Sequence, residues 1–235
     1  GRKRKWNIHN PKSKEEVFYA PQLIGISGSP IKNSNTDRLV QAVLEASGLE
    51  YEFVKLSKVN IKPCIACLGC VGDNICKVND DFPELAEKLK KAHGLVIGSY
   101  PPYASVDGFS KAFLERLFSM RHQNHLNQGK LAVVVTTGIG RGAPGLDEAG
   151  QQVSMALQME GMEVIGQLKA LGNVECLVCG YGEDCPMSAL PWVFGKGVQV
   201  SPDKFCNVED QAEVWDQAQK LGHELSQRVK SQTLM

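Results

Sequence analysis

The sequence has no excess of either charge. Its 26 Lys and Arg residues balance 26 Asp and Glu residues, so bulk charge gives no reason to expect binding to nucleic acid or to a membrane surface. No apolar run is long enough for a transmembrane helix, and the basic stretch at residues 2–5 is not followed by an apolar core. We therefore expect no signal peptide, no membrane segment and a cytoplasmic location.

Several nucleotide-binding and catalytic motifs are also missing. There is no G-x-G-x-x-G fingerprint and no glycine-rich loop ending in Lys-Ser or Lys-Thr, so neither a Rossmann dinucleotide site nor an ATP-type P-loop is indicated. No catalytic triad is visible, and no side chain stands out as a general acid or base. The sequence therefore predicts chemistry carried by cofactors, with no catalytic side chain of its own.

The sequence does contain eight cysteines, which fall into two groups. The first group has the spacing C-x2-C-x2-C-x5-C, and the second has C-x2-C-x5-C followed by one more distant cysteine. In a reducing cytoplasm, cysteines more often hold metal than form disulfides. The predicted metal ligands are Cys64, Cys67, Cys70 and Cys76 in the first group, and Cys176, Cys179, Cys185 and Cys206 in the second.

The first cysteine group is compact enough for its thiolates to converge on one metal centre. Gly69 and Gly72 permit the tight backbone bends that this requires. Ligation by thiolates alone selects zinc or an iron–sulfur cluster, and zinc sites usually place two C-x2-C pairs far apart. The spacing favours a [4Fe–4S] cluster, although the fourth cysteine of a bacterial ferredoxin run follows sooner and precedes a proline. Zinc is the alternative, and disulfides are the least favoured.

The second cysteine group also bends at glycines, Gly180 and Gly182. Three close ligands and one distant ligand can hold either a second [4Fe–4S] cluster or a structural zinc ion. Four inert thiols are the remaining alternative.

Five segments predict the strands of a parallel sheet, and helical patterns lie between them. Residues 23–27, 94–99 and 131–135 are continuous apolar runs, residues 51–56 alternate and are β-prone, and residues 162–166 give a fifth strand. A helix over roughly 208–230 follows. This pattern predicts an α/β fold with a doubly wound five-stranded parallel sheet. The expected divisions are a basic N-terminal extension at 1–20, a main domain at 21–170 with a cysteine-rich insertion at 61–80, and a cysteine-rich C-terminal extension at 171–235.

A small, hydroxyl-rich loop joins the first strand to the first helix. Backbone N–H groups at a helix N-terminus attract phosphate, and ligands of parallel sheets sit at the carboxyl ends of strands. An ordinary turn with an Asn or Thr cap is the alternative. The candidate binding residues are Ser27, Ser29, Pro30, Ser34, Asn35 and Thr36.

The motif Gly28-Ser29-Pro30 followed by Ser34-Asn35-Thr36 resembles the FMN phosphate loop of the flavodoxin-like NAD(P)H-dependent FMN reductases. With the compact cysteine run downstream, the chain resembles the iron–sulfur flavoproteins of that superfamily over roughly residues 22–170. The resemblance implies a flavodoxin-like fold that binds FMN. It also implies that two further segments contact the flavin: Pro102, Tyr103, Ala104 and Ser105, and Thr136, Thr137 and Gly138.

Alternatives remain open for individual residues. The loop around Tyr103 could be a proline-stiffened turn with a packing tyrosine. Arg141 could favour a reduced anionic flavin or a nicotinamide phosphate, or be a solvated loop arginine, and Arg116 is expected to be structural.

The resemblance implies an FMN-dependent oxidoreductase. It would pass electrons from ferredoxin or NAD(P)H through [4Fe–4S] and FMN to a small acceptor such as oxygen, peroxide or a quinone-like compound. It would form a homodimer or homotetramer, with no nucleic-acid or membrane partner. One alternative is an electron carrier or redox sensor with no substrate of its own. Another is an NAD(P)H-dependent FMN or quinone reductase whose cysteines hold structural zinc.

Overall fold

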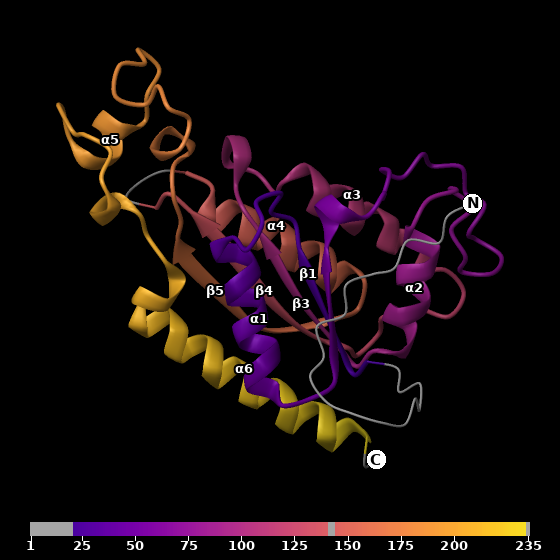
Figure 1. Cartoon of the computed structure of the whole chain (residues 1–235). Helices are drawn as coiled ribbons and strands as arrows, with labels where there is room; N and C mark the ends of the chain where they lie inside the picture. Colours follow the sequence, from indigo (N-terminus) through magenta and orange to yellow (C-terminus); the bar gives the residue numbers. More distant parts are fainter. Residues whose placement is uncertain (1–20, 141–143, 234–235) are drawn as a thin grey trace, which may run out of the picture.

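The computed structural model describes residues 21–140 and 144–233. Five parallel strands form one sheet in the order β2-β1-β3-β4-β5 (Figure 1). The strands are β1 (Leu23–Ser27), β2 (Tyr51–Lys55), β3 (Gly94–Ser99), β4 (Leu131–Gly138) and β5 (Glu163–Leu171). In this flavodoxin-like order the connections reverse between β1 and β3, which is where ligands bind in such sheets. The predicted fold class is confirmed.

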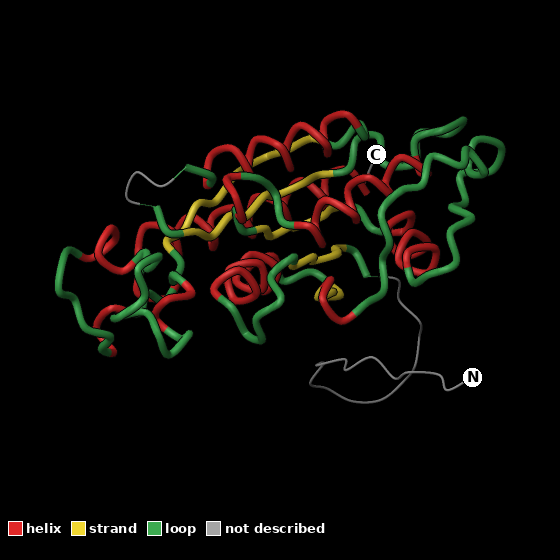
Figure 2. The backbone as a smooth tube through the Cα atoms, turned by 90° about the horizontal axis from the view of Figure 1, so that it is seen from above, coloured by secondary structure: helices red, strands yellow, loops and turns green. Residues whose placement is uncertain are grey.

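Helices cover both faces of the sheet (Figures 1 and 2). One face is covered by α1 (Asn35–Ser47) and α6 (Ala212–Thr233). The other is covered by α2 (Phe82–Lys91), α3 (Gly108–Leu117) and α4 (Leu146–Met159). Successive residues of β4 point to opposite faces, so Val133 packs with α1 and α6 while Val134 packs with α3 and α4. This two-sided burial is why β1, β3 and most of β4 are continuous apolar runs.

Two strands extend further than the sequence indicates. β4 was expected to end at residue 135, but it includes Thr136 and Thr137, which are buried. Their hydroxyls are used inside the protein, since Thr136 Oγ1 donates to the Leu168 carbonyl (3.5 Å) and Thr137 Oγ1 bonds Thr36 Oγ1 (2.6 Å). Buried polar groups with partners do not end a strand. β5 likewise continues to Leu171 instead of residue 166.

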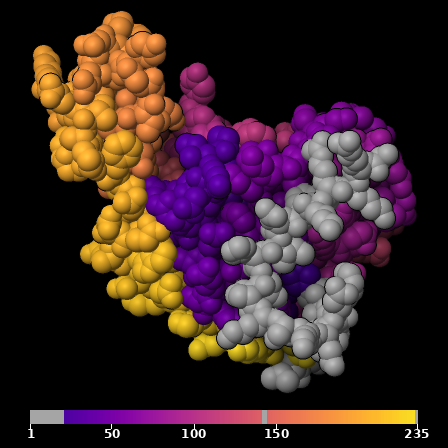
Figure 3. All heavy atoms as spheres, viewed as in Figure 1, coloured from indigo at the N-terminus to yellow at the C-terminus, as the bar shows by residue number. Residues whose placement is uncertain are grey.

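A C-terminal lobe, residues 172–211, stands out from the main body in Figure 3 (orange to yellow, upper left). It contains the short helix α5 (Leu190–Phe194) and a small apolar core of Val174, Leu177 and Leu190. The cysteine loop, residues 61–80, lies at the other end of the molecule in Figures 1 and 2. The final helix begins at Ala212 and not near residue 208, because Val208–Asp210 forms a 3-10 turn.

Some predictions lie outside the described residues, namely the basic extension at 1–20 and the role of Arg141. Within the part of the chain that the structure describes, no helix is long and apolar enough to cross a membrane.

Candidate functional site

The predicted phosphate loop leads directly into the capped N-terminus of α1. Ser34 is the N-cap: its Oγ accepts the Asp37 N–H (3.1 Å), and the Asp37 carboxylate accepts the Ser34 N–H (3.2 Å). The Ser34 hydroxyl is therefore used in the cap. The first-turn N–H groups of Asn35 and Thr36 have no intrahelical acceptor and carry the positive end of the helix dipole. This end of α1 can therefore receive an anion.

A buried ion pair missed by sequence reasoning fastens this loop. Asp37 is 3% exposed, and its carboxylate accepts hydrogen bonds from Lys55 Nζ (2.6 Å) and from Ser27 Oγ (2.6 Å). Lys55 Nζ also donates to the Ile31 carbonyl in the middle of the loop (2.7 Å). Lys55 thus offsets a carboxylate that would otherwise repel a phosphate, and it holds the loop. The available signal was a lysine at the carboxyl end of β2.

The loop after β3 presents an unusual backbone. Tyr103 and Ala104 both have left-handed φ angles, 51° and 57°, and the Tyr103 side chain is fully exposed. Residues other than glycine hold this conformation at an energetic cost, and such positions cluster at ligand sites. Ser105 Oγ bonds the Gln152 side chain (2.9 Å), which fixes the far end of the loop. The exposed ring is therefore displayed by a fixed turn.

The candidate flavin-binding segments meet at the carboxyl edge of the sheet. A Cβ on Gly138 would lie 3.0 Å from Pro101, so the end of β4 packs against the loop after β3. A Cβ on Gly28 would clash with the Asp107 carboxylate, so the phosphate loop packs against the start of α3. Asp107 is fully buried and accepts from Ser99 Oγ (2.6 Å). The structure therefore brings the predicted segments together at the switch point of the sheet.

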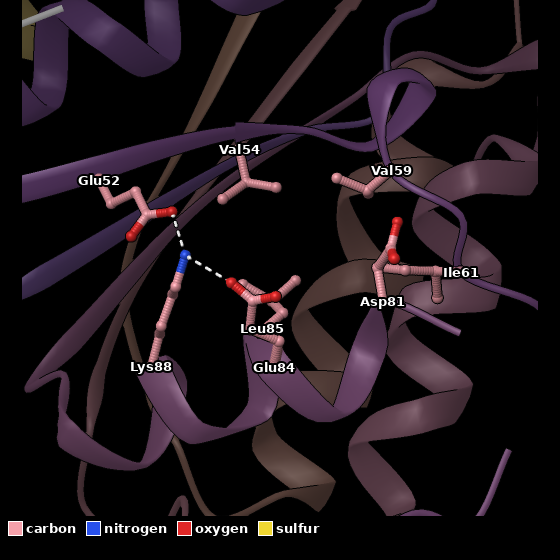
Figure 4. Close-up of a pocket in the computed structure, with 8 residues that line it drawn as sticks. All are labelled: Glu52, Val54, Val59, Ile61, Asp81, Glu84, Leu85 and Lys88. Atoms are coloured by element: carbon pink, nitrogen blue, oxygen red, sulfur yellow. Dashed lines mark hydrogen bonds and ion pairs between the residues drawn. The ribbon is translucent and has the colours of Figure 1, made fainter. Parts of the chain in front are cut away.

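The cysteine loop is held at its base by two consecutive aspartates. The Asp81 carboxylate accepts the Asn60 N–H (2.7 Å), and the Asp81 N–H donates to the Asn60 carbonyl (2.9 Å). Figure 4 shows the Asp81 side chain between Val59 and Ile61, beside a hollow under β2 that ends at the Lys88–Glu52 ion pair. The two ends of the long loop are thus tied together.

Asp80 forms the second tie, a buried ion pair with Arg116 of α3. Both side chains are 0% exposed, and the guanidinium donates to the two carboxylate oxygens at 2.5 and 3.0 Å. Arg116 also donates to the Lys62 carbonyl (2.9 Å) and lies over the Phe82 ring. Although burial raises the pKa of Asp80, hydrogen bonds from Arg116 and the Lys62 N–H hold it below its ordinary value. The expectation that Arg116 is structural agrees with this pairing.

We expect Asp80→Ala to lower the free energy of unfolding by about 3–5 kcal/mol, because it leaves the Arg116 charge buried and unpaired. Denaturant unfolding of the metal-free protein measures this. The matched control is Asp147→Ala, which removes an exposed partner of Lys169 and should cost about 0–1 kcal/mol. Equal effects of the two substitutions would contradict a stabilising role of the buried pair.

All cysteines of the first group line one pocket, together with Arg116. Ala66 and Leu68, which lie between these cysteines, have left-handed φ angles of 52° and 55°, so the loop is sharply folded. Burial raises the pKa of the Cys70 thiol, and the charges of Cys76, Cys67 and Cys64 raise it further. The four thiols therefore share one pocket, where a bound cationic centre would offset the charge of their thiolates.

The donor set of this pocket fits a soft metal centre. Thiolates select zinc or iron–sulfur clusters. Arg116 lines the same pocket, and its buried Nε has no hydrogen-bond partner. Among residues 21–140 and 144–233, no three His, Cys, Asp or Glu side chains already stand close enough together to hold a metal ion. The predicted ligands thus line one pocket, but their side chains are not arranged in a complete metal site.

In the C-terminal lobe, two cysteine sulfurs accept backbone hydrogen bonds. The Tyr181 N–H donates to Cys179 Sγ (3.4 Å), and the Ala189 N–H donates to Cys176 Sγ (3.4 Å). Gly180 follows Cys179 with a φ of 80°, which permits the turn between them. Hydrogen bonds to sulfur are also among the features that tune a metal centre held by cysteines.

Cys206 lies at the base of the lobe, next to α1. Its carbonyl accepts from Asn35 Nδ2 (2.8 Å), its N–H donates to Asn173 Oδ1 (2.7 Å), and its sulfur accepts from Gln211 Nε2 (3.3 Å). The lobe is therefore fastened to the first residue of the helix that follows the phosphate loop. The two cysteine groups lie at opposite ends of the molecule in both ribbon views, so they cannot share one centre.

Comparison with known proteins identifies the family. The sequence matches the NADPH-dependent FMN reductase family over residues 21–173. The chain belongs to this family. It is 28% identical over 156 residues to an iron-sulfur flavoprotein of Methanosarcina thermophila, covering 65% of this chain and 81% of that protein. It is 32% identical over 148 residues to an iron-sulfur flavoprotein of Methanocaldococcus jannaschii, covering 62% of this chain and 76% of that protein.

Membership in the FMN reductase family confirms the predicted FMN-dependent oxidoreductase and the resemblance to iron–sulfur flavoproteins. Solved structures agree on the fold. RosB is 15% identical with a TM-score of 0.61, covering 90% of this chain and 81% of that chain. A WrbA-like flavodoxin from Agrobacterium tumefaciens is 10% identical with a TM-score of 0.51, covering 90% of this chain and 98% of that chain. The C-terminal lobe lies almost wholly beyond the family match.

Proposed function

We propose that this protein is an iron–sulfur flavoprotein oxidoreductase. It passes electrons from ferredoxin or NAD(P)H, through a [4Fe–4S] cluster held by the cysteine loop and through FMN, to a small acceptor such as oxygen, peroxide or a quinone-like compound. The observation that carries the proposal is the pocket lined by all cysteines of the first group, in a member of an FMN reductase family. When bound, FMN supplies two-electron chemistry and the cluster supplies one-electron transfer.

The N-terminus of α1 would hold the phosphate end of FMN. The first-turn N–H groups would donate to the phosphate, and Lys55 offsets the charge of Asp37 in the same region. Ser29 lies in the loop as a buried residue, and Asn35 and Thr36 begin the helix. Ser27 acts from behind the loop, because its hydroxyl donates to Asp37 and accepts the Ser29 N–H.

The loop after β3 and the end of β4 would hold the ring end of FMN. Tyr103 offers an exposed aromatic face, and the packing of Pro101 on Gly138 keeps the two segments in contact. Thr137 is tied to Thr36 at 2.6 Å, which links this wall to the phosphate-binding helix. These residues bind and orient the flavin, and no side chain of the chain moves a proton in this account.

We propose that Cys176, Cys179, Cys185 and Cys206 hold a second metal, either a [4Fe–4S] cluster or zinc. The N–H···S bonds to Cys176 and Cys179 support thiolate ligation. The small core of the lobe supports it too, because segments with few buried apolar residues often need a metal to fold.

Cys179→Ala should remove this second metal and leave the iron of the cysteine loop in place. Quantification of iron and zinc by mass spectrometry, per chain, checks this for the variant beside the unchanged protein. If the lobe holds a metal, the variant should contain one zinc ion or about four iron ions fewer per chain than the unchanged protein. Each alternative uses all the ligands of the site, so loss of one ligand should release the metal. Unchanged metal content would show that the thiols of the lobe are inert and hold no metal.

We also propose a homodimer or homotetramer. Ile65, Leu68 and Ile75 of the cysteine loop are exposed apolar side chains, and contact with another copy would cover them. Light scattering of the metal-loaded protein tests this, and a monomer at micromolar concentration would contradict it.

The experiment for the function combines composition with turnover. Protein purified without oxygen should contain FMN, iron and acid-labile sulfide. It should also show saturable reduction of an acceptor with ferredoxin or NAD(P)H. Stoichiometric transfer without turnover would indicate a carrier or sensor, whereas zinc with a plain flavin spectrum would indicate an ordinary flavin or quinone reductase.

A further inference from the structure

One buried cation lines the pocket of the cysteine loop. Two cationic side chains, Arg116 and Lys77, are among the pocket residues. Lys77 is about half exposed and pairs with the equally exposed Asp73 on the surface. Arg116 is fully buried, and its contacts with Asp80 and the Lys62 carbonyl use only the two terminal nitrogens of the guanidinium.

The remaining nitrogen, Arg116 Nε, is buried and has no hydrogen-bond partner. An unpaired buried N–H is costly, so Arg116 Nε remains available to donate to a further acceptor. Cys76 is the candidate acceptor: it lines the same pocket as Arg116, and unlike Cys64 and Cys67 it is not exposed. Cys76 also packs against the apolar core under α3 as a partly buried side chain.

We propose that Arg116 is a positioning residue for the metal centre, donating its Nε–H to the sulfur of the Cys76 ligand and making the centre easier to reduce. Asp80 binds the two terminal nitrogens of the guanidinium, which leaves Nε as its unused donor. Arg116 therefore acts in two ways, closing the base of the loop through its terminal nitrogens and tuning the centre through Nε.

The direction of the effect follows from charge. Reduction adds one electron to the cluster, and no bond breaks in the step. An N–H donor and a buried positive charge both stabilise the more negative reduced form, so they raise the midpoint potential. The inference rests on the proposed function, since it requires a cluster in the pocket.

The first test compares Arg116→Lys with the unchanged protein, both loaded with iron under anaerobic conditions. Lysine keeps the charge and can still pair with Asp80, but it has no Nε–H. At a fixed potential, the ratio of reduced to oxidised cluster should fall about tenfold, equivalent to about 59 mV for one electron. Arg228→Lys, on the exposed ion pair with Glu163, is the matched control and should leave the ratio unchanged.

A second measurement is made on the unchanged protein. In protein labelled with 15N-arginine, pulsed electron paramagnetic resonance of the reduced cluster should detect coupling to an arginine 15N nucleus. Arg116 is the arginine that lines the pocket, so this coupling should disappear in Arg116→Lys.

The outcomes distinguish a failure of the proposed function from a failure of the role proposed for Arg116. Unchanged protein that contains no iron contradicts the proposed function itself. A cluster that forms with full iron content, yet shows no 15N coupling and an unaltered potential in Arg116→Lys, overturns the role of Arg116 alone. If Arg116→Lys loses iron or fails to fold, the labelled unchanged protein still decides, because absence of coupling there overturns the proposal.

Discussion

Cys67→Ala is expected to remove the iron and sulfide of the cysteine loop while leaving FMN bound. Cys67 is an exposed side chain, so its truncation removes a ligand without opening a cavity in the core. The base of the loop keeps its own ties, Asp80 with Arg116 and Asp81 with Asn60. A [4Fe–4S] cluster has one cysteine per iron, and loss of a ligand should reduce iron from this centre to near background.

The elements proposed to bind FMN are separate from this loop. They begin at the carboxyl ends of β1, β3 and β4, whereas the cysteine loop joins β2 to α2. The measurement is iron, sulfide and FMN per chain after anaerobic purification of the variant. Cys179→Ala is the matched control, because the same substitution in the C-terminal lobe should spare this centre. Loss of FMN together with iron in Cys67→Ala would show that the two sites depend on each other.

Ser29→Asp is expected to prevent FMN binding. Ser29 is buried within the loop that leads to α1, so a carboxylate there would face the phosphate in a region with little water. Two like charges about 4 Å apart repel by roughly 4 kcal/mol at an effective dielectric constant near 20. At about 1.4 kcal/mol for each tenfold change, this weakens FMN binding by roughly three orders of magnitude.

Titration of the flavin-free protein with FMN, followed by flavin fluorescence, measures the dissociation constant. Ser29→Asn is the matched control, because asparagine has the size of aspartate without its charge. The neutral variant should bind FMN far more tightly than Ser29→Asp. Similar losses in both would assign the effect to side-chain size, and unchanged affinity in Ser29→Asp would place the phosphate elsewhere.

The sequence predicted the sheet because its strands are buried on both sides. Continuous apolar runs at β1, β3 and β4 leave few other interpretations. Strand ends were harder to predict, since Thr136 and Thr137 look like loop residues until their partners at Leu168 and Thr36 are known. The hydrogen bonds that keep these threonines in the strand come from distant parts of the chain.

The candidate site was likewise predictable from the sequence only in part. The close spacing of the first cysteine group predicted that its members would meet, because a short segment limits how far apart they can be. The ion pairs that fasten the loops were not predicted. Asp80 and Arg116 are 36 residues apart, and Asp37 and Lys55 are 18 apart, so no local pattern links them. Only the tertiary fold brings these side chains together.

The central claim is that the cysteine loop holds an iron–sulfur cluster in a protein that also binds FMN. A crystal structure from oxygen-free protein, with anomalous scattering measured on both sides of the iron absorption edge, tests it directly. The account predicts an iron peak among Cys64, Cys67, Cys70 and Cys76, and flavin density between Tyr103 and the N-terminus of α1. An empty pocket, or a peak that appears only at the zinc edge, would contradict it.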